Sequence, residues 1–401
     1  MLVVIVIVVA AVVARLITLT PPNLVVHAAF PSTVRLPGPG PEPAWPIGGE
    51  AALVVQGLGS LGSAGGDEPR PTASLAKVMT AYLTLKKYPL SGTGGGFTLT
   101  VTPADARSEV EDTRLDQSVV AVRAGETLDE RQLLEALLIP SGDNIAQMLA
   151  AYEAGSVSQF VAEMNRTARA LGMSRTTYTD PSGYAPTTVS DAGDQVRVFE
   201  RALRFAAFRQ IVSMPSVTLP VAGTLKNYDP LISAGYFGKT GSDSEAEGCL
   251  AFFKYMRVAG RRFTVVGVVL GQGEGPVTSV ILGAAAAAAH HLVASVAPAI
   301  RARTVLPAGT AVIIASSTDG HQVRAVTAAP LRVIGWGGMR ERLTIRARSL
   351  ATDHLGAGEL LGQAALGGKL PTTAAGATRT AVRAPVALPA PGISWRLAHL
   401  L

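Results

Sequence analysis

The chain has 401 residues, of which 48% are hydrophobic and 16% charged, and its formal net charge is +6. This length allows two or more domains, and the composition excludes an intrinsically disordered protein. The positive charge is small for the length, and no run of Lys and Arg is interleaved with aromatic residues, so nucleic acid is not an expected partner. A negatively charged membrane or cell-wall surface is compatible with this charge.

The scarce metal-ligating residues exclude several kinds of site. Cys249 is the only cysteine, so an intramolecular disulfide, a CxxC redox site and a cysteine-rich zinc site are excluded. No histidine lies between His27 and His290. A Ser-His-Asp triad or a His-ligated metal would have to be assembled from the two ends of the chain. We therefore expect neither a metal nor a cofactor.

The first 49 residues differ in composition from the rest. Residues 2–14 are all apolar, which favours a signal peptide or membrane anchor over residues 1–19, and a buried strand is the alternative. Either form of export predicts a protein that acts outside the cytoplasm. Residues 20–49 are dense in proline and poor in charge, which predicts a stiff linker without regular structure.

Residues 50–297 have the patterns of a mixed α+β domain. The order of one strand, several helices, a hairpin and a last helix predicts a sheet with an inserted helical subdomain. Residues 298–401 have short Val/Ile-rich stretches separated by Gly and Pro, which predicts a small β-rich C-terminal domain. In the first domain we expect strands at 51–56, 248–258 and 262–270, and helices at 75–87, 129–138, 144–153, 157–171, 196–208 and 277–296.

Ser74 and Lys77 are the first candidates for chemistry. They lie three residues apart at the start of an expected helix, so their side chains share one face. A nearby lysine can take the proton of a serine hydroxyl if burial or another cation lowers its pKa. An N-cap serine followed by a solvated lysine is the simpler interpretation of this pair taken alone.

Two further polar segments favour a catalytic role for Ser74 and Lys77 over a helix cap. Ser141, Asp143 and Asn144 lie at an expected turn before a helix, where a helix cap is the simpler interpretation. Lys239, Thr240, Gly241 and Ser242 follow an apolar run, so Lys239 would lie in a strand. There it could hold a substrate carboxylate and lower the pKa of Lys77 by like charge, although a polar strand end explains this segment equally well.

The three motifs in this order are typical of one enzyme superfamily. Ser-x-x-Lys, a Ser-Asp-Asn-like motif and Lys-Thr-Gly characterise the β-lactamases and penicillin-binding proteins. The chain resembles the serine-type D-alanyl-D-alanine carboxypeptidases, which are low-molecular-mass penicillin-binding proteins. Segments 160–173, 180–183 and 225–227 are also similar to that family, and the resemblance covers roughly residues 50–290.

The resemblance implies a fold and a set of roles. The fold would be an α/β sandwich of the β-lactamase/transpeptidase type. Ser74 would attack the bond between the two D-alanines that end a peptidoglycan stem peptide, and Lys77 would take the proton. Ser141 would pass a proton to the leaving amine, while Lys239 and Thr240 would bind the terminal carboxylate. The N–H groups of Ser74 and Ser242 would form the oxyanion hole, and β-lactam antibiotics would act as covalent inhibitors.

One position departs from the family pattern. The second motif of the family is Ser-x-Asn, whereas this chain has Asp143 at the third position and Asn144 after it. Either Asp143 replaces the amide in substrate binding, which we favour, or a local shift brings Asn144 into that role. The alternatives are a β-lactamase, a transpeptidase that uses an amine in place of water, and a cell-wall binding protein that has lost turnover.

Overall fold

The computed structural model describes residues 1–66, 68–367 and 378–400. The chain forms two compact units. One comprises Glu42–Arg257 and Arg262–Pro298, and contains all the candidate catalytic residues. The other comprises Met1–Pro41, Val258–Arg261 and Ala299–Leu401. We call them the catalytic unit and the β unit.

The catalytic unit is built around a five-stranded antiparallel sheet with the strand order β11-β12-β13-β3-β4. Two of its strands form the predicted hairpin, in which Ala259 and Gly260 both have positive φ (47° and 79°), as a tight two-residue turn requires. The strands are β3 (Glu50–Val55), β4 (Gly59–Ala64), β11 (Tyr236–Asp243), β12 (Glu247–Val258) and β13 (Arg261–Gln272).

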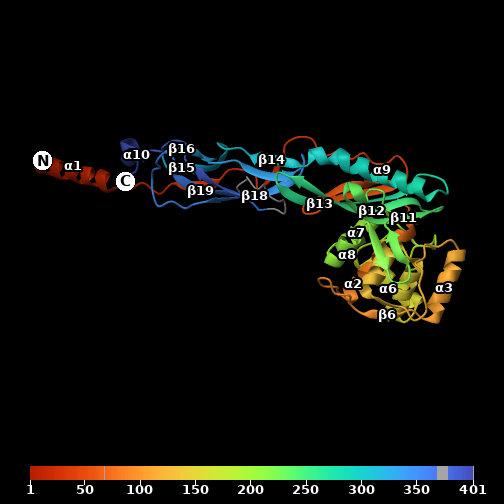
Figure 1. Ribbon diagram of the computed structural model, residues 1–401. Coiled ribbons are helices and arrows are strands. Elements are labelled where there is room, and N and C mark those ends of the chain that lie inside the picture. Colours follow the sequence, from red (N-terminus) through yellow and green to blue (C-terminus); the bar gives the residue numbers. More distant parts are fainter. Residues whose placement is uncertain (67, 368–377, 401) are drawn as a thin grey trace. The chain divides into compact units, whose positions relative to one another are not determined.

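Helices cover both faces of this sheet (Figure 1). On one face lies α9 (Thr278–Val296), so close that a Cβ at Gly248 of β12 would lie 2.0 Å from the Ile281 carbonyl oxygen. On the other face lies a helical subdomain, as the sequence predicts. Its helices are α2 (Lys77–Lys87), α3 (Pro103–Arg114), α4 (Glu130–Leu138), α5 (Asp143–Ala154), α6 (Val157–Ala170), α7 (Ala192–Ala202) and α8 (Ala206–Ile211).

The single helix predicted over 196–208 is wrong, because the chain breaks between α7 and α8. Phe199 and Phe208 are nine residues apart and would lie on opposite faces of a straight helix. Both rings are fully buried, and they contact each other edge to face with their centroids 5.7 Å apart. The break at residues 203–205 therefore lets two aromatic rings enter the same core.

Two of the buried carboxyl groups in the helical subdomain have a pKa raised to about 7. Glu130 begins α4 and is 1% exposed, and burial raises its pKa to about 7. Burial also raises the pKa of Glu153 in α5 to about 7, although its carboxyl group accepts a hydrogen bond from Thr84 at 2.5 Å. Both groups bind a proton more tightly in the folded chain than in the unfolded chain. Their contribution to stability is therefore complete below about pH 4.5 and is lost as the pH rises through about 7.

Replacing Glu130 by glutamine should therefore stabilise the protein only at the higher pH. At pH 8 the free energy of unfolding should rise by up to about 3 kcal/mol, the equivalent of the pKa shift, because an uncharged amide replaces a buried carboxylate. At pH 4 the change should be close to zero, because the carboxyl group is then mostly protonated in both the folded and the unfolded chain. Thermal unfolding of the wild type and Glu130→Gln at both values measures this, and an equal gain at both would show that ionisation is not the cause.

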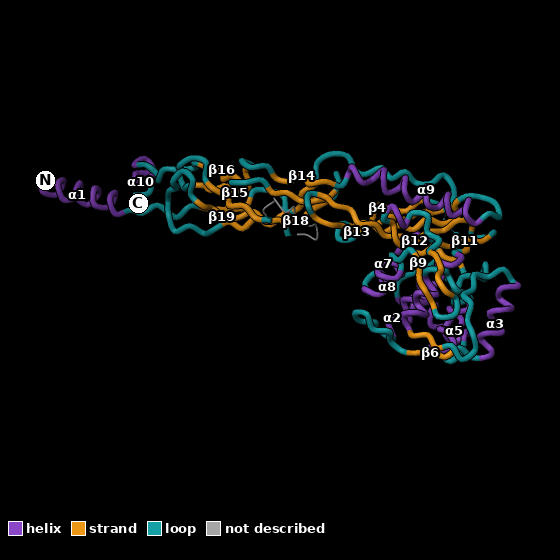
Figure 2. The backbone as a smooth tube through the Cα atoms, viewed as in Figure 1, coloured by secondary structure: helices purple, strands orange, loops and turns teal. Residues whose placement is uncertain are grey.

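The β unit consists mainly of strands in its described part (Figure 2). Seven strands form a sheet in the order β1-β15-β16-β20-β19-β18-β2, and β14 pairs with β17. A separate apolar core includes the fully buried Val312, Ile313 and Leu361. The strands are β1 (Val25–Ala28), β2 (Thr33–Arg35), β14 (Arg301–Leu306), β15 (Ala311–Ser316), β16 (Gln322–Thr327), β17 (Leu331–Gly335), β18 (Arg340–Ala347), β19 (Leu360–Leu366) and β20 (Arg379–Arg383).

The prediction that residues 20–49 lack regular structure is wrong for two stretches. Val25–Ala28 pairs antiparallel with β15, and Thr33–Arg35 pairs antiparallel with β18. Neither stretch contains a proline, so every residue in it can donate to a strand ladder. The N-terminal segment is thus part of the β unit, and prolines are confined to the stretches around these strands.

The apolar N-terminal segment forms α1 (Leu2–Thr18), in which no residue is buried. Its end lies beside α10 (Ile393–Ala398), where Arg396 donates a hydrogen bond to the Leu16 carbonyl oxygen at 2.9 Å. Among the described residues one helical stretch, Thr278–Ala299, is long and apolar enough to span a membrane. It is 44% buried and includes α9, which packs on the sheet of the catalytic unit.

Candidate active site

Ser74 lies in a tight 3₁₀ turn, Ala73–Ala76, that runs directly into α2. Ala73, just before it, has a positive φ of 43°, which is unfavourable for a residue with a Cβ and must be held by its surroundings. The Lys77 amine lies 2.6 Å from the Ser74 hydroxyl oxygen. The predicted proximity of nucleophile and amine is therefore present in the structure.

Close packing around two glycines holds this turn. A Cβ at Gly183, where φ is +85°, would lie 1.8 Å from the Ala73 carbonyl oxygen. A Cβ at Gly241 would lie 2.9 Å from the Thr72 carbonyl oxygen and 3.3 Å from the Ala73 Cβ. The serine turn is thus clamped between β11 and the loop after residue 180, and only glycine permits this approach on both sides.

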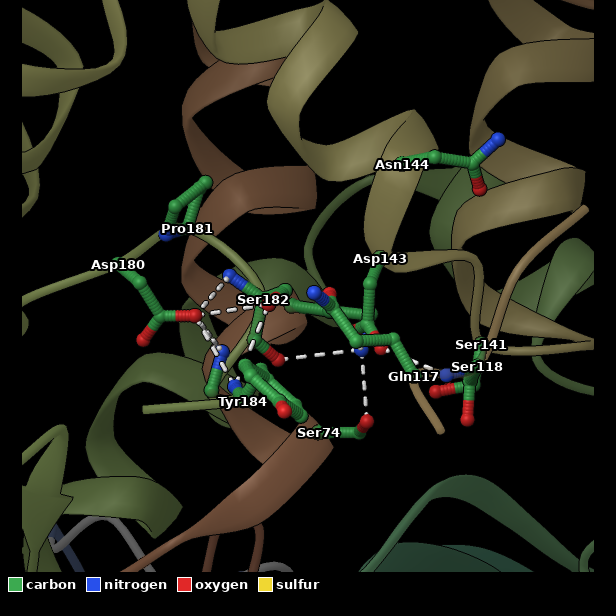
Figure 3. A network of polar contacts seen from close by, with 12 residues as sticks. Ser74, Gln117, Ser118, Ser141, Asp143, Asn144, Asp180, Pro181, Ser182 and Tyr184 are labelled. Carbon is green, nitrogen blue, oxygen red and sulfur yellow. Dashed lines mark hydrogen bonds and ion pairs between the residues drawn. The ribbon is translucent and has the colours of Figure 1, made fainter. Parts of the chain in front are cut away.

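The Lys77 side chain is fully buried and has three polar partners. Besides Ser74, it donates to Asp143 Oδ1 at 2.6 Å and to the Ser182 carbonyl oxygen at 3.1 Å. Asp143 is the first residue of α5, and its Oδ2 accepts a hydrogen bond from the Ser118 backbone N–H at 2.9 Å. The Lys77 amine thus joins Ser74, Asp143 and the Ser182 carbonyl, which surround it. Figure 3 shows these three residues.

The Asp180 carboxylate shapes the loop that carries Ser182. Its Oδ2 accepts hydrogen bonds from three successive backbone N–H groups, those of Ser182, Gly183 and Tyr184, at 3.2, 2.7 and 3.0 Å (Figure 3). Three converging donors fix the loop in one conformation. The Ser182 carbonyl therefore has a defined direction, toward Lys77.

Ser141 and Lys239 form the other side of the site. Ser141 has a positive φ of 69°, a strained conformation for serine, and its hydroxyl accepts a hydrogen bond from the Lys239 amine at 2.9 Å. Lys239 lies in β11 and also donates to the Thr240 carbonyl oxygen at 2.8 Å. Strand β11 and the turn that carries Ser141 therefore meet at this hydrogen bond.

Electrostatics favour the uncharged form of Lys239. Burial lowers its pKa well below the usual lysine value, and the neighbouring charge of Lys77 lowers it further, whereas Asp143 and Asp229 act in the opposite direction. Burial raises the pKa of Asp229 to about 6 even though Lys239 is near. Two amines and two carboxyl groups thus share one buried region, and such a cluster of groups with shifted pKa values is typical of an active site.

Most of the predicted site residues come together here. Hydrogen bonds join Ser74, Lys77 and Asp143 in one group and Ser141 and Lys239 in another, and Lys239 interacts electrostatically with Lys77 and Asp143. Thr240, Gly241 and Ser242 continue β11 past the serine turn. Asn144 does not join them. Its side chain points away and exchanges two hydrogen bonds with the Val120 backbone, at 2.8 and 3.0 Å (Figure 3).

Sequence reasoning missed three contributors, namely Ser118, the Ser182 carbonyl and Asp229. Ser118 and Ser182 contribute only backbone groups, so their residue types carry no signal. Asp229 lies in a loop, and its place beside Lys239 depends on the fold. Within the described residues, no group of three or more His, Cys, Asp or Glu side chains is placed to hold a metal ion.

Comparison with known proteins decides the family. Residues 59–273, which include every residue of the site, match the family model described as D-alanyl-D-alanine carboxypeptidase. The chain belongs to this family. The matched region of this D-alanyl-D-alanine carboxypeptidase family member contains Ser74, Lys77 and Lys239. These are the residues on which the resemblance to the family was based.

Relatives support the assignment. D-alanyl-D-alanine carboxypeptidase DacB2 of Mycobacterium tuberculosis is 32% identical over 185 residues, which are 44% of this chain and 59% of that protein. A D-alanyl-D-alanine carboxypeptidase of a Streptomyces species is 31% identical over 51% of this chain and 73% of its own length. A D-alanyl-D-alanine endopeptidase of Pseudomonas aeruginosa is 32% identical, with coverages of 50% and 65%. The chain therefore spans about three fifths to three quarters of these relatives.

The fold agrees with a solved structure. The crystal structure of a Streptomyces DD-transpeptidase is similar with a TM-score of 0.54 and 26% identity, over 64% of this chain and 98% of that one. The predicted α+β fold with a transpeptidase-like catalytic domain is confirmed. The similarity to the Streptomyces structure covers 64% of this chain, a share similar to that of the catalytic unit. The rest of the chain is not part of the similarity.

Proposed function

We propose that the protein is a serine D-alanyl-D-alanine carboxypeptidase that removes the last D-alanine from peptidoglycan stem peptides through an acyl-enzyme on Ser74. One observation carries this proposal. A serine hydroxyl and a buried amine lie 2.6 Å apart, and a second buried lysine faces them through Ser141. The membership of the family agrees with it.

Acylation starts at Ser74. Its proton passes to the uncharged Lys77 amine while the hydroxyl oxygen attacks the carbonyl carbon between the two D-alanines. The negative charge on the former carbonyl oxygen is held by the backbone N–H groups of Ser74 and Ser242. Such fixed donors stabilise the tetrahedral intermediate more than water does, because they need no reorganisation.

The leaving D-alanine needs a proton and a place for its carboxylate. Ser141 gives its hydroxyl proton to the leaving nitrogen and regains one from Lys239, 2.9 Å away. Lys239 and Thr240 bind the terminal carboxylate of the substrate, which brings a negative charge beside the amine. That charge favours the protonated form of Lys239 and so supplies the proton when the substrate is bound.

Water completes the reaction by hydrolysing the acyl-enzyme. A transpeptidase would use an amine in that step, and a β-lactamase would release penicillin rapidly. Action outside the cytoplasm follows from the substrate, which is a cell-wall peptide. The apolar residues of α1, none of which is buried, support export or anchoring through the N-terminal segment. β-Lactams would be covalent inhibitors of the exported enzyme.

Two assays with the wild-type chain test the function. The first measures release of the terminal alanine from a synthetic stem peptide that ends in D-Ala-D-Ala and from one that ends in L-Ala-L-Ala, with and without an added amine acceptor. We expect release from the D,D peptide only, with free tripeptide or tetrapeptide acid as the main product. A peptide–amine conjugate as the main product would indicate a transpeptidase instead.

The second assay follows labelled penicillin on the protein. A carboxypeptidase should hold the label for minutes to hours, because its acyl-enzyme with a β-lactam is slow to react with water. Rapid release of hydrolysed penicillin would indicate a β-lactamase. If no label is bound and no D-alanine is released, the chain is a binding protein without turnover.

A further inference from the structure

Asp143 is engaged entirely by the protein. Its Oδ1 accepts from the Lys77 amine at 2.6 Å, its Oδ2 accepts from the Ser118 N–H at 2.9 Å, and its side chain is 5% exposed. The position of Asp143 in the second motif favours a substrate-binding role for this residue. In the structure, neither oxygen is left facing solvent for that purpose, so Asp143 needs another explanation.

The chemistry of its two neighbours requires a carboxylate. The Ser118 N–H can only donate a hydrogen bond, and the Lys77 amine donates toward Oδ1. A carboxylate has an acceptor for each of them, whereas an asparagine amide has one acceptor and one donor. With asparagine here, either Ser118 or the amine would face an N–H group. An aspartate at position 143 therefore offers one acceptor oxygen to each of its two donors, Lys77 and Ser118.

We propose that Asp143 is a positioning residue that acts through Lys77: its carboxylate turns the lone pair of the amine toward the Ser74 hydroxyl, and its charge sets the pH range in which the amine is free to accept a proton. This inference rests on the proposed function, because it concerns the base of the same acylation step.

The orientation follows from counting donors. An uncharged amine has two N–H bonds and one lone pair, and Lys77 has three partners. The Asp143 carboxylate and the Ser182 carbonyl can only accept, so they take the two N–H bonds. The Ser74 hydroxyl is the one partner that can donate. The lone pair therefore faces Ser74, and the hydroxyl proton moves to the amine nitrogen as the serine oxygen bonds to the substrate carbonyl carbon.

The charges around Lys77 oppose one another. The negative Asp143 carboxylate on α5 lies 2.6 Å from the Lys77 amine, and the positive partner in the same region is Lys239 on β11, which interacts electrostatically with Lys77. Asp229 acts on Lys239, and Asp112 of α3 acts on Asp143, but neither contacts Lys77. Asp180 is directed at the backbone of its own loop and at Thr188. Asp143 is thus the carboxylate in direct contact with the amine.

The test is the pH dependence of Ser74 acylation. We would measure the second-order rate constant for labelling by a fluorescent penicillin from pH 5 to 10 in the wild type and in Asp143→Asn. The acidic limb of the profile should move to lower pH by about one unit or more, because the ammonium form loses its carboxylate partner. The plateau rate should fall at least several-fold, because the amine is a weaker base and its orientation is no longer fixed.

Asp112→Asn is the matched control. It removes the same charge from a neighbouring helix without touching Lys77, so it should leave the acidic limb nearly in place. A lower plateau with an unmoved limb in Asp143→Asn would show a merely structural role and overturn this inference, while the proposed function would stand. No labelling of the wild type at any pH would overturn both.

A second measurement applies if Asp143→Asn does not fold. The chain has seven lysines, so the side-chain nitrogen signals of ¹⁵N-lysine-labelled wild type can be resolved and that of Lys77 assigned by its loss in Lys77→Arg. The Lys77 signal should change to that of a free amine over the same pH range as the acidic limb of acylation. A Lys77 amine that is already uncharged where acylation is lost would overturn the inference.

Discussion

Replacing Ser74 by alanine should remove nearly all release of D-alanine and abolish covalent penicillin binding. The loss should be about 10⁴-fold or more, which is typical for removal of a nucleophile that forms a covalent intermediate. The reason is structural, because Ser74 is the hydroxyl in contact with the Lys77 amine and lies at the turn held by Gly183 and Gly241. Kinetics with the D-Ala-D-Ala peptide measure this loss directly.

Ser158→Ala provides the matched control. Ser158 is an exposed serine of α6 in the same unit, so its loss should leave the rate and the melting temperature unchanged. Ser74→Ala should also melt close to the wild type, since a small, half-buried hydroxyl is removed and no cavity of consequence forms. Equal release of D-alanine by the wild type and Ser74→Ala would contradict the proposed mechanism.

Replacing Lys239 by methionine should lower kcat/KM for the D-Ala-D-Ala peptide by about 10²- to 10³-fold, because loss of a buried charged contact costs 2–5 kcal/mol. The side chain keeps its length and its fit to the buried site but loses the bond to Ser141 and the charge that holds the substrate carboxylate. The wild type should prefer the free acid over the same peptide with a C-terminal amide. Lys239→Met should lose most of that preference.

Lys254→Met is the control for this prediction. Lys254 lies opposite Tyr236 on the adjacent strand, and its amine bonds to the Ala234 carbonyl, away from Ser74 and Ser141. Its replacement should leave kcat/KM and the acid-over-amide preference as they are. If Lys239→Met retained full preference for the free acid, the substrate carboxylate would have to bind elsewhere.

Local patterns in the sequence predict much of the catalytic unit. The spacing of Ser74 and Lys77 places both side chains on one helical face, and the turn at Ala259 and Gly260 closes the predicted hairpin. The helix α3 was missed although its capping box is visible in the sequence. Thr102 and Asp105 cap one another at its start, with Pro103 in the first turn.

Other features depend on contacts between distant segments, which no local pattern encodes. Lys239 meets Ser141 across 98 residues of chain, and the two strands before residue 36 pair with strands beyond residue 310. The role of Asp143 has the same origin. Its motif position suggests a substrate contact, but the partner that accounts for it is the Ser118 backbone N–H, which the fold brings there from 25 residues away.

The most direct test of the account is the position of the penicillin adduct. The wild-type chain would be labelled with penicillin near pH 8 and digested, and the modified residue located by mass spectrometry. We expect one penicilloyl group per chain, on Ser74, and no modification after Lys77→Met within the same time. An adduct on any other residue, or none on Ser74, would contradict the claim that Ser74 and Lys77 together form the acylating centre.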